Sequence, residues 1–204
     1  LLALGGWDAW NVAEDADLGL RIARRGGTVL DLASTTYEEA PIHLDGWLRQ
    51  RRRWFKGWLQ TAAVNARQPS AAIERMGLTG WLVAQVGVLG LVLSALCYPF
   101  FSAWISWNFW TGDLFDAATP LAFVTNSVAL AVAATGGLSM VAPALIGLRR
   151  RRLWHLAPWL ATLPIYMVLV SVAAWMAIWD LNRRPFHWGK TEHGLGRRNP
   201  QRFR

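Results

Sequence analysis

Residues 78–101 read LTGWLVAQVGVLGLVLSALCYPFF and contain no charged side chain. A run of this length and composition can cross the hydrocarbon core of a bilayer as a helix. Two further apolar segments follow at about 119–148 and 156–180. The whole stretch from 78 to 148 lacks lysine and arginine, and its only acids are Asp113 and Asp116. The sequence therefore predicts a transmembrane helical region with about three hydrophobic segments.

The charged residues lie outside these segments. Residues 1–77 hold ten Lys/Arg and nine Asp/Glu, a balance typical of a soluble region. The other cations are Arg149–Arg152 and a tail that begins at Arg183, and both clusters flank apolar segments. The net charge of +8 is therefore placed to meet anionic lipid headgroups. Nucleic acid is disfavoured as a partner, because the cations do not follow one soluble face.

Cysteine and histidine offer no metal site in this sequence. Cys97 is the only cysteine, which excludes an intrachain disulfide and a cysteine metal cluster. His187 and His193 lack a convincing zinc spacing. The chain begins LLALGG, without methionine or a basic region, so it does not have the pattern of a signal peptide. We expect that it starts inside a domain whose N-terminal part is missing.

Helix and strand signals alternate in the first block. A segment from Asp15 to Gly27 opens with acids, ends with bases and stops at glycines, which predicts a helix. Thr28–Leu32 then predicts a short strand. From Leu44 to Arg67, Trp and Leu recur at helical spacing, with arginines and Lys56 on the other side. That pattern predicts an amphipathic helix in the membrane interface.

The basic clusters also predict an orientation. By the positive-inside rule, residues 1–77 and Arg149–Arg152 face the cytoplasm, and two crossings between them satisfy both. A third crossing would place the basic tail outside, against the rule. Pro158 and Pro164 make the third segment a candidate for a re-entrant or interfacial hairpin. The sequence leaves this question open.

Glu14 and Asp15 stand where a turn meets the start of the first predicted helix. Acids in a first helical turn stabilise the helix dipole by about 0.3–1 kcal/mol, which is one explanation of the pair. The other is a general base, which needs a carboxylate within hydrogen-bond reach of an acceptor hydroxyl. Asp17 is expected to support the helix instead.

Gln50, Arg53 and Trp54 are spaced i, i+3 and i+4, so they share one face of the second predicted helix. Arginine can hold a departing diphosphate through paired hydrogen bonds, and tryptophan can stack on a sugar ring. An amphipathic surface helix would also carry Arg and Trp, and the spacing alone does not separate these readings. Arg51 and Arg52 are expected to point towards lipid headgroups.

Four motifs occur in order: Gly5-Gly6-Trp7, Ala13-Glu14-Asp15, Glu38-Glu39-Ala40-Pro41 and Gln50-Arg51-Arg52-Arg53-Trp54-Phe55-Lys56-Gly57. Together they resemble the C-terminal half of family 2 glycosyltransferases, in the membrane-integrated processive branch that includes cellulose, hyaluronan and poly-N-acetylglucosamine synthases. The tail, with Trp188, Lys190, Thr191, His193 and Gly194, resembles the end of bacterial exopolysaccharide synthases of this family. Ala13 departs from the family's Thr-Glu-Asp motif but leaves its carboxylates in place.

The resemblance implies roles for these residues. Asp15, beside Glu14, would be the catalytic base, and Gln50, Arg53 and Trp54 would bind the diphosphate and the acceptor sugar. The donor would be a nucleotide-sugar, most plausibly UDP-linked, and the acceptor a growing glycan at the inner cell membrane with the catalytic region in the cytoplasm. Mg²⁺ or Mn²⁺ is implied, with ligands outside this chain, so the isolated chain is expected to be inactive.

The resemblance also implies the fold class: α/β, as the C-terminal part of a Rossmann-like GT-A domain, followed by an α-helical transmembrane bundle. The expected divisions are the GT-A part at 1–43, the interface helix at 44–77, membrane helices at 78–182 and a basic cytoplasmic tail at 183–204. Two other functions stay open. One is a single-transfer enzyme acting on a lipid carrier, and the other is a non-enzymatic membrane scaffold or transport subunit.

Overall fold

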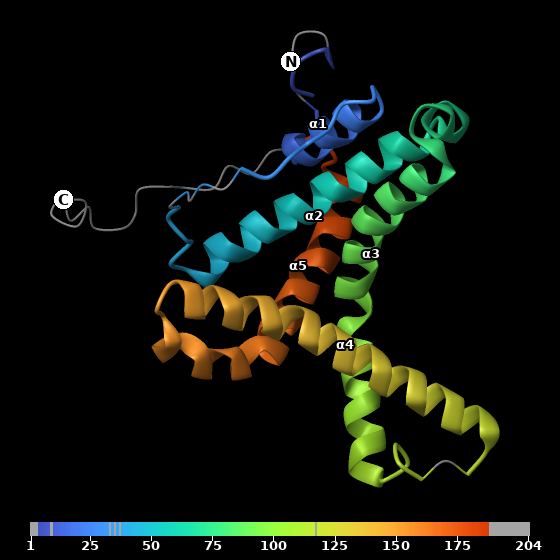
Figure 1. The fold of residues 1–204 in the computed structure, drawn as a ribbon, viewed down its shortest axis with the longest axis vertical. Coiled ribbons are helices and arrows are strands. Elements are labelled where there is room, and N and C mark those ends of the chain that lie inside the picture. The colour runs from blue at the N-terminus through green and yellow to red at the C-terminus, as the bar shows by residue number, and fades with distance from the viewer. Residues whose placement is uncertain are drawn as a thin grey trace, which may run out of the picture. The chain divides into compact units, whose positions relative to one another are not determined.

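The computed structural model describes residues 4–187, except 9, 33, 35, 37 and 117. Helices account for 77% of it. In chain order they are α1 (Glu14–Ala23), α2 (Leu44–Ala66), α3 (Pro69–Thr111), α4 (Pro120–Arg150), the 3-10 helix η2 (Trp154–Thr162) and α5 (Leu163–Arg183) (Figure 1). The motif expected in the tail after His187 lies outside the described residues.

The predicted α/β class is wrong, because none of the described residues forms a strand or a sheet. The segment Thr28–Leu32, which we predicted as a strand, has no regular structure. Its apolar side chains are exposed: Val29 by 65%, Leu30 by 83% and Leu32 by 85%. A strand forms only where its backbone N–H and C=O groups pair with a neighbouring strand. No such neighbour is present among the described residues, so strand-like composition alone does not fix the conformation here.

Three helical stretches are long and apolar enough to cross a membrane. They are Pro69–Thr111, Pro120–Arg150 and Trp154–Arg183, with mean hydropathies of 2.0, 1.8 and 1.9. Only 17%, 6% and 22% of their most apolar windows are buried inside the protein. Helices that are apolar on all sides and so little covered by protein require an apolar solvent. The chain is therefore suited to a membrane, as the apolar segments predicted.

Helix α3 is interrupted at Gly77, which has φ 73° and ψ 161°. This is a backbone conformation that glycine adopts without strain and that side chains with a Cβ avoid. The break comes where the charged residues Glu74 and Arg75 give way to the uncharged run beginning at Leu78. The membrane-length part of α3 therefore starts at the residue where the first apolar segment was predicted to start.

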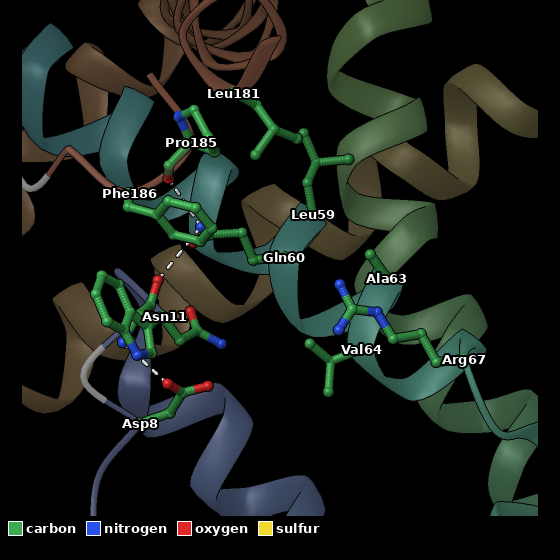
Figure 2. A pocket seen from close by; sticks show the side chains of 11 residues that line it. Asp8, Asn11, Leu59, Gln60, Ala63, Val64, Arg67, Leu181, Pro185 and Phe186 are labelled. Carbon is green, nitrogen blue, oxygen red and sulfur yellow. Dashed lines mark hydrogen bonds between the residues drawn. The ribbon is translucent and has the colours of Figure 1, made fainter. Parts of the chain in front are cut away.

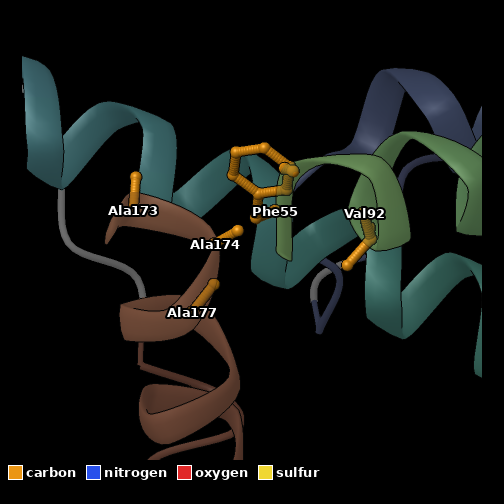
Figure 3. Close-up of a cluster of buried hydrophobic side chains, with 6 residues drawn as sticks. Phe55, Val92, Ala173, Ala174 and Ala177 are labelled. Atoms are coloured by element: carbon orange, nitrogen blue, oxygen red, sulfur yellow. The ribbon is translucent and has the colours of Figure 1, made fainter. Parts of the chain in front are cut away.

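The chain folds as two compact units: Leu1–Leu96 together with Leu169–Arg204, and Cys97–Val168. In the first unit, the core joins Phe55 of α2 and Val92 of α3 to three alanines of α5 (Figure 3). The three alanines, Ala173, Ala174 and Ala177, are fully buried. Small side chains allow helices to approach closely, and these alanines form the α5 side of the core.

In the second unit, the N-terminus of α4 is fixed by local hydrogen bonds. The Thr119 hydroxyl accepts a hydrogen bond from the Ala122 N–H at 3.1 Å, and Pro120 occupies the first turn. At the other end, Arg152 has φ 57°, and η2 then packs against α4 (Figure 1). The predicted third apolar segment is thus divided into η2 and α5. Whether it crosses the membrane stays a prediction.

Candidate active site

Gln50, Arg53 and Trp54 lie in α2, and each is partly buried. Together with Gly57 they occupy positions i, i+3, i+4 and i+7, which form one continuous stripe along a helix. The helix predicted from the Trp and Leu spacing is therefore present, and its motif residues share a face that continues to Gly57.

The segment that leads into α1 lies directly on this stripe. A Cβ built on Gly57 would lie 2.2 Å from the Ala13 Cβ and 2.5 Å from the Ala13 backbone nitrogen. No real side chain tolerates such distances, so only glycine permits this contact. Ala13, the N-cap residue of α1, is buried there. The site thus depends on two small residues placed against each other, and Ala13 is the position where this sequence departs from the family's threonine.

Hydrogen bonds hold the same segment along α2. The Asn11 side chain donates from Nδ2 to the Thr61 hydroxyl at 2.8 Å. The Val12 N–H donates to Oε1 of Gln60 at 3.3 Å. As the chain advances from residue 11 to 13, its contacts move along α2 from Thr61 to Gly57, towards the turn that holds Arg53 and Trp54.

Glu14 and Asp15 follow at once, in the first turn of α1. The Asp15 side chain is exposed, and its Oδ1 accepts a hydrogen bond from the Ala16 N–H at 2.8 Å. Through this hydrogen bond Asp15 stabilises the start of α1, and its exposure leaves the carboxylate accessible to a ligand. The two roles proposed from the sequence are therefore compatible. The connection between the acidic pair and the Gln50–Trp54 set runs through Ala13 and Gly57.

Arg51 makes a contact that was not predicted from the sequence, and its expected contact with lipid headgroups stays a prediction. Its guanidinium carbon lies 4.5 Å from the ring centroid of Trp54 and 5.4 Å from that of Trp47. Positions 47, 51 and 54 recur at helical spacing, so the arginine stacks on the aromatic rings of its own helix. In addition, the Nε atoms of Arg51 and Arg53 are buried with no hydrogen-bond partner within the described structure. Buried donors without a partner are rare, and an anionic oxygen that reached them would satisfy them.

Asp17 supports the helix, as expected from the sequence. It is buried and forms an ion pair with Arg21 at 2.7 Å. The Arg21 Nη1 also donates to the carbonyls of Leu4 and Gly6, both at 2.8 Å, which holds the preceding turn. Burial raises the pKa of Asp17, and the charge and hydrogen bond of Arg21 oppose that rise.

Lys56 was missed by the sequence reasoning, which placed it on the outer, basic face of the helix. It is only 1% exposed, and its Nζ lies 2.9 Å from Oδ2 of Asp180 in α5. It also donates to the carbonyl of His187 at 2.6 Å and to that of Arg184 at 3.2 Å. The available signal was Asp180 itself, the only acid in the apolar segment 156–180, since an acid at such a place calls for a partner.

A cavity of about 540 Å³ lies beside the same junction (Figure 2). Its polar wall includes Gln60, whose Nε2 donates to the carbonyl of Pro185 at 2.9 Å and more weakly to that of Trp10 at 3.4 Å. The rings of Trp10 and Phe186 meet edge to face, with centroids 5.4 Å apart. The lining contains none of the five predicted site residues; it is formed by Asp8, Trp10, Asn11, Leu59, Gln60, Ala63, Val64, Arg67, Leu181, Pro185 and Phe186.

Metal ligands do not cluster in the part of the chain that the structure describes, where no group of three or more His, Cys, Asp or Glu side chains could hold an ion. The described residues therefore offer no cluster of ligands for the divalent metal that the resemblance implies.

The chain was compared with protein families, with curated proteins and with solved structures. No curated protein and no solved structure matches it. The model of one family, described as glycosyl transferase family group 2, matches residues 1–182. This match covers α1, the motif-bearing helix α2 and all three membrane-length stretches except the last residue of α5. On that evidence, together with the acidic pair and the arginine and tryptophan of α2, the chain belongs to glycosyl transferase family group 2.

Proposed function

We propose that this glycosyltransferase is a membrane-embedded, inverting enzyme that extends a polysaccharide with sugars from a nucleotide-sugar and passes the product into the bilayer. One observation carries the proposal: the helix with Gln50, Arg53 and Trp54 shares a core with membrane-length helices. Phe55, which follows Trp54 directly, packs in one cluster with Val92 of α3 and Ala174 of α5. A site on this helix is therefore tied to the helices that would border a path for the product.

In the proposed reaction Asp15 is the general base. An acceptor hydroxyl oxygen forms a bond to the anomeric carbon of the donor sugar, and its proton passes to the Asp15 carboxylate. The bond between the anomeric carbon and the diphosphate oxygen breaks, and the nucleoside diphosphate leaves. The exposure of Asp15 supports this role, because the carboxylate is open to an incoming hydroxyl.

Arg53 and Trp54 are assigned to the leaving group and the acceptor. The Arg53 Nε is buried without a hydrogen-bond partner among the described residues, and a diphosphate oxygen would satisfy it. Trp54 would stack on the terminal sugar of the acceptor, with Arg51 fixing its ring from one side. Gln50, one turn away on the same face, would donate to a sugar or phosphate oxygen.

A divalent metal would neutralise charge on the diphosphate in such an enzyme. Since the described residues do not form a site for it, we assign no step of the reaction to a metal held by this chain. The proposal keeps the expectation that the 204-residue chain does not transfer sugar by itself, and a UDP-sugar donor and an inner-membrane location with a cytoplasmic active site are parts of the same proposal.

The test is an Asp15→Asn variant of the full-length natural protein, assayed in membranes with radiolabelled UDP-sugars. We expect loss of polymer with normal membrane insertion and thermal stability. Asp45→Asn is the matched control, because Asp45 is an exposed acid on α2 that pairs with Arg49. Transfer that persists in Asp15→Asn would remove the base assignment. A single added sugar instead of a ladder on a gel would favour the single-transfer enzyme, and no transfer by the natural protein from any donor would favour the scaffold.

A further inference from the structure

Lys56 uses all of its hydrogen-bonding capacity inside the protein. An ammonium group has three donors. The Lys56 Nζ lies at hydrogen-bond distance from three acceptors: Oδ2 of Asp180, the His187 carbonyl and the Arg184 carbonyl. These acceptors are 124 to 131 residues away in sequence, so one side chain of α2 holds the end of α5 and the segment that follows it.

Simple packing does not require a charge at this position. Burying an ion pair costs desolvation free energy, and apolar side chains of similar size often serve stability as well or better. The two carbonyls are a separate matter, because Arg184 and His187 follow the C-terminal end of α5 at Arg183. A cation at a helix C-terminus satisfies carbonyls that have no partner inside the helix and matches the helix dipole. A buried lysine supplies this function and methionine does not.

The segment that Lys56 holds, just after α5, contacts the stretch of chain that leads to the acidic pair. Gln60, four residues after Lys56, donates to the carbonyls of Pro185 and Trp10 and so joins the two segments (Figure 2). The Phe186 ring packs edge-on against Trp10. Trp10 is followed by Asn11, Val12 and Ala13, the residues docked on α2. Lys56 is thus connected to the acidic pair through residues 184–187 and Trp10.

We propose that Lys56 is a positioning residue: by binding Asp180 and the carbonyls of residues 184 and 187, it holds this segment against Trp10 and thereby fixes the approach of the Glu14–Asp15 pair to α2. The inference rests on the proposed role of Asp15. Lys56 does not touch the reacting atoms in this scheme, and it acts by keeping the base aligned.

The decisive comparison separates positioning from stability. Lys56→Met leaves the partly buried Asp180 without its partner, so loss of stability alone could explain a loss of activity. The double variant Lys56→Met/Asp180→Leu removes both charges and is expected to recover thermal stability. It does not restore the hydrogen bonds to the two carbonyls. Lys56→Arg keeps the charge and donors and should retain most of the function. Arg49→Met is the matched control, because it breaks an exposed ion pair on the same helix.

Two measurements on the full-length natural protein in detergent or nanodiscs test the proposal. The first is hydrogen exchange at the Arg184 and His187 amides, which donate to the carbonyls of Asp180 and Arg184. We expect exchange at least about tenfold faster in Lys56→Met and in the double variant, but unchanged in Arg49→Met. The second is sugar transfer, where kcat should fall by about 10- to 100-fold in both variants with KM for the nucleotide-sugar unchanged, because a misaligned base weakens only the transition state.

Protected amides in Lys56→Met would overturn the proposal, and so would fast exchange with normal kcat. Full recovery of kcat in the double variant would show that the pair serves stability alone. If Asp15→Asn keeps full activity, the proposed function fails instead, and the exchange measurement still decides whether Lys56 holds the segment.

Discussion

Replacing Gly57 by alanine adds one methyl group where the start of α1 meets α2. The new Cβ would lie 2.2 Å from the Ala13 Cβ, whereas ordinary contact begins at 3.4 Å, so about 1.2 Å must be taken up by movement. The nearest atoms of Ala13 include its backbone nitrogen and Cα, which cannot rotate away. The segment carrying Glu14 and Asp15 therefore has to shift as a whole.

Two free-energy terms oppose each other in this variant. Alanine is preferred over glycine in a helix by about 1 kcal/mol. Overpacking of a close contact costs about 1–3 kcal/mol. The net loss of stability is then at most about 2 kcal/mol, too little to unfold an ordinary domain. The rate of sugar transfer is more sensitive than stability, since displacing a catalytic group by about 1 Å can lower the rate about 100-fold. We expect a folded protein with kcat reduced by one to two orders of magnitude.

The assay is initial-rate sugar transfer, with thermal unfolding measured on the same preparation. Gly19→Ala is the matched control: Gly19 lies in α1 with nothing within 4 Å of its Cβ position, so this variant should gain stability by about 1 kcal/mol and keep its activity. Normal kcat in Gly57→Ala would refute the argument that this contact sets the position of the acidic pair. Equal loss in both variants would point to a general effect of changing glycine.

Three further outcomes are expected. Trp54→Ala should raise KM for the glycan acceptor several-fold while leaving KM for the nucleotide-sugar nearly unchanged, because the acceptor sugar loses the aromatic face on which it would stack. Equal effects on both substrates would contradict the assignment. Burial raises the pKa of Asp17 above 3.8, so its contribution favours the folded state below pH 3.8 and is lost as pH rises through the folded value. The difference in melting temperature between Asp17→Asn and the natural protein should therefore become more positive as pH rises across this window. A difference that does not change with pH would contradict the raised pKa of Asp17. Ala174→Leu should destabilise the protein by about 1–3 kcal/mol in chemical unfolding, since Ala174 is fully buried, whereas Ala133→Leu on the exposed surface of α4 should not.

The sequence predicted those features that depend on neighbours along one helix. The spacing of Gln50, Arg53 and Trp54 fixed a common face. The uncharged runs located the second and third membrane-length stretches within a few residues, whereas the first, Pro69–Thr111, extends well beyond the predicted segment 78–101 at both ends. Features that depend on distant partners were not predicted. Thr28–Leu32 has strand-like composition but no strand beside it among the described residues. The spacing within α2 did not show that Lys56 would turn inward, because its partner Asp180 lies in another helix. Asp180, as the only acid in its apolar segment, signalled the need for a partner but not which residue it would be.

The stacking of Arg51 on Trp47 and Trp54 was missed for a different reason. The spacing of Arg51 from Trp47 and Trp54 was visible in the sequence, but whether the guanidinium stacks on their rings depends on its rotamer. A guanidinium can stack on a ring at little desolvation cost, so the rings of its own helix can compete with solvent. Only the structure shows which contact forms.

The first compact unit is assembled from two stretches of chain, residues 1–96 and 169–204, with the whole second unit between them. This arrangement imposes an order on biosynthesis. At about 5–20 residues per second, the 124 residues that separate Lys56 from Asp180 take roughly 6–25 seconds to be translated. During that interval α2 has been made but lacks α5, so Phe55 is uncovered and the Lys56 ammonium has no acid to meet. We expect the membrane interface, or a chaperone, to shelter this helix until α5 has emerged from the ribosome.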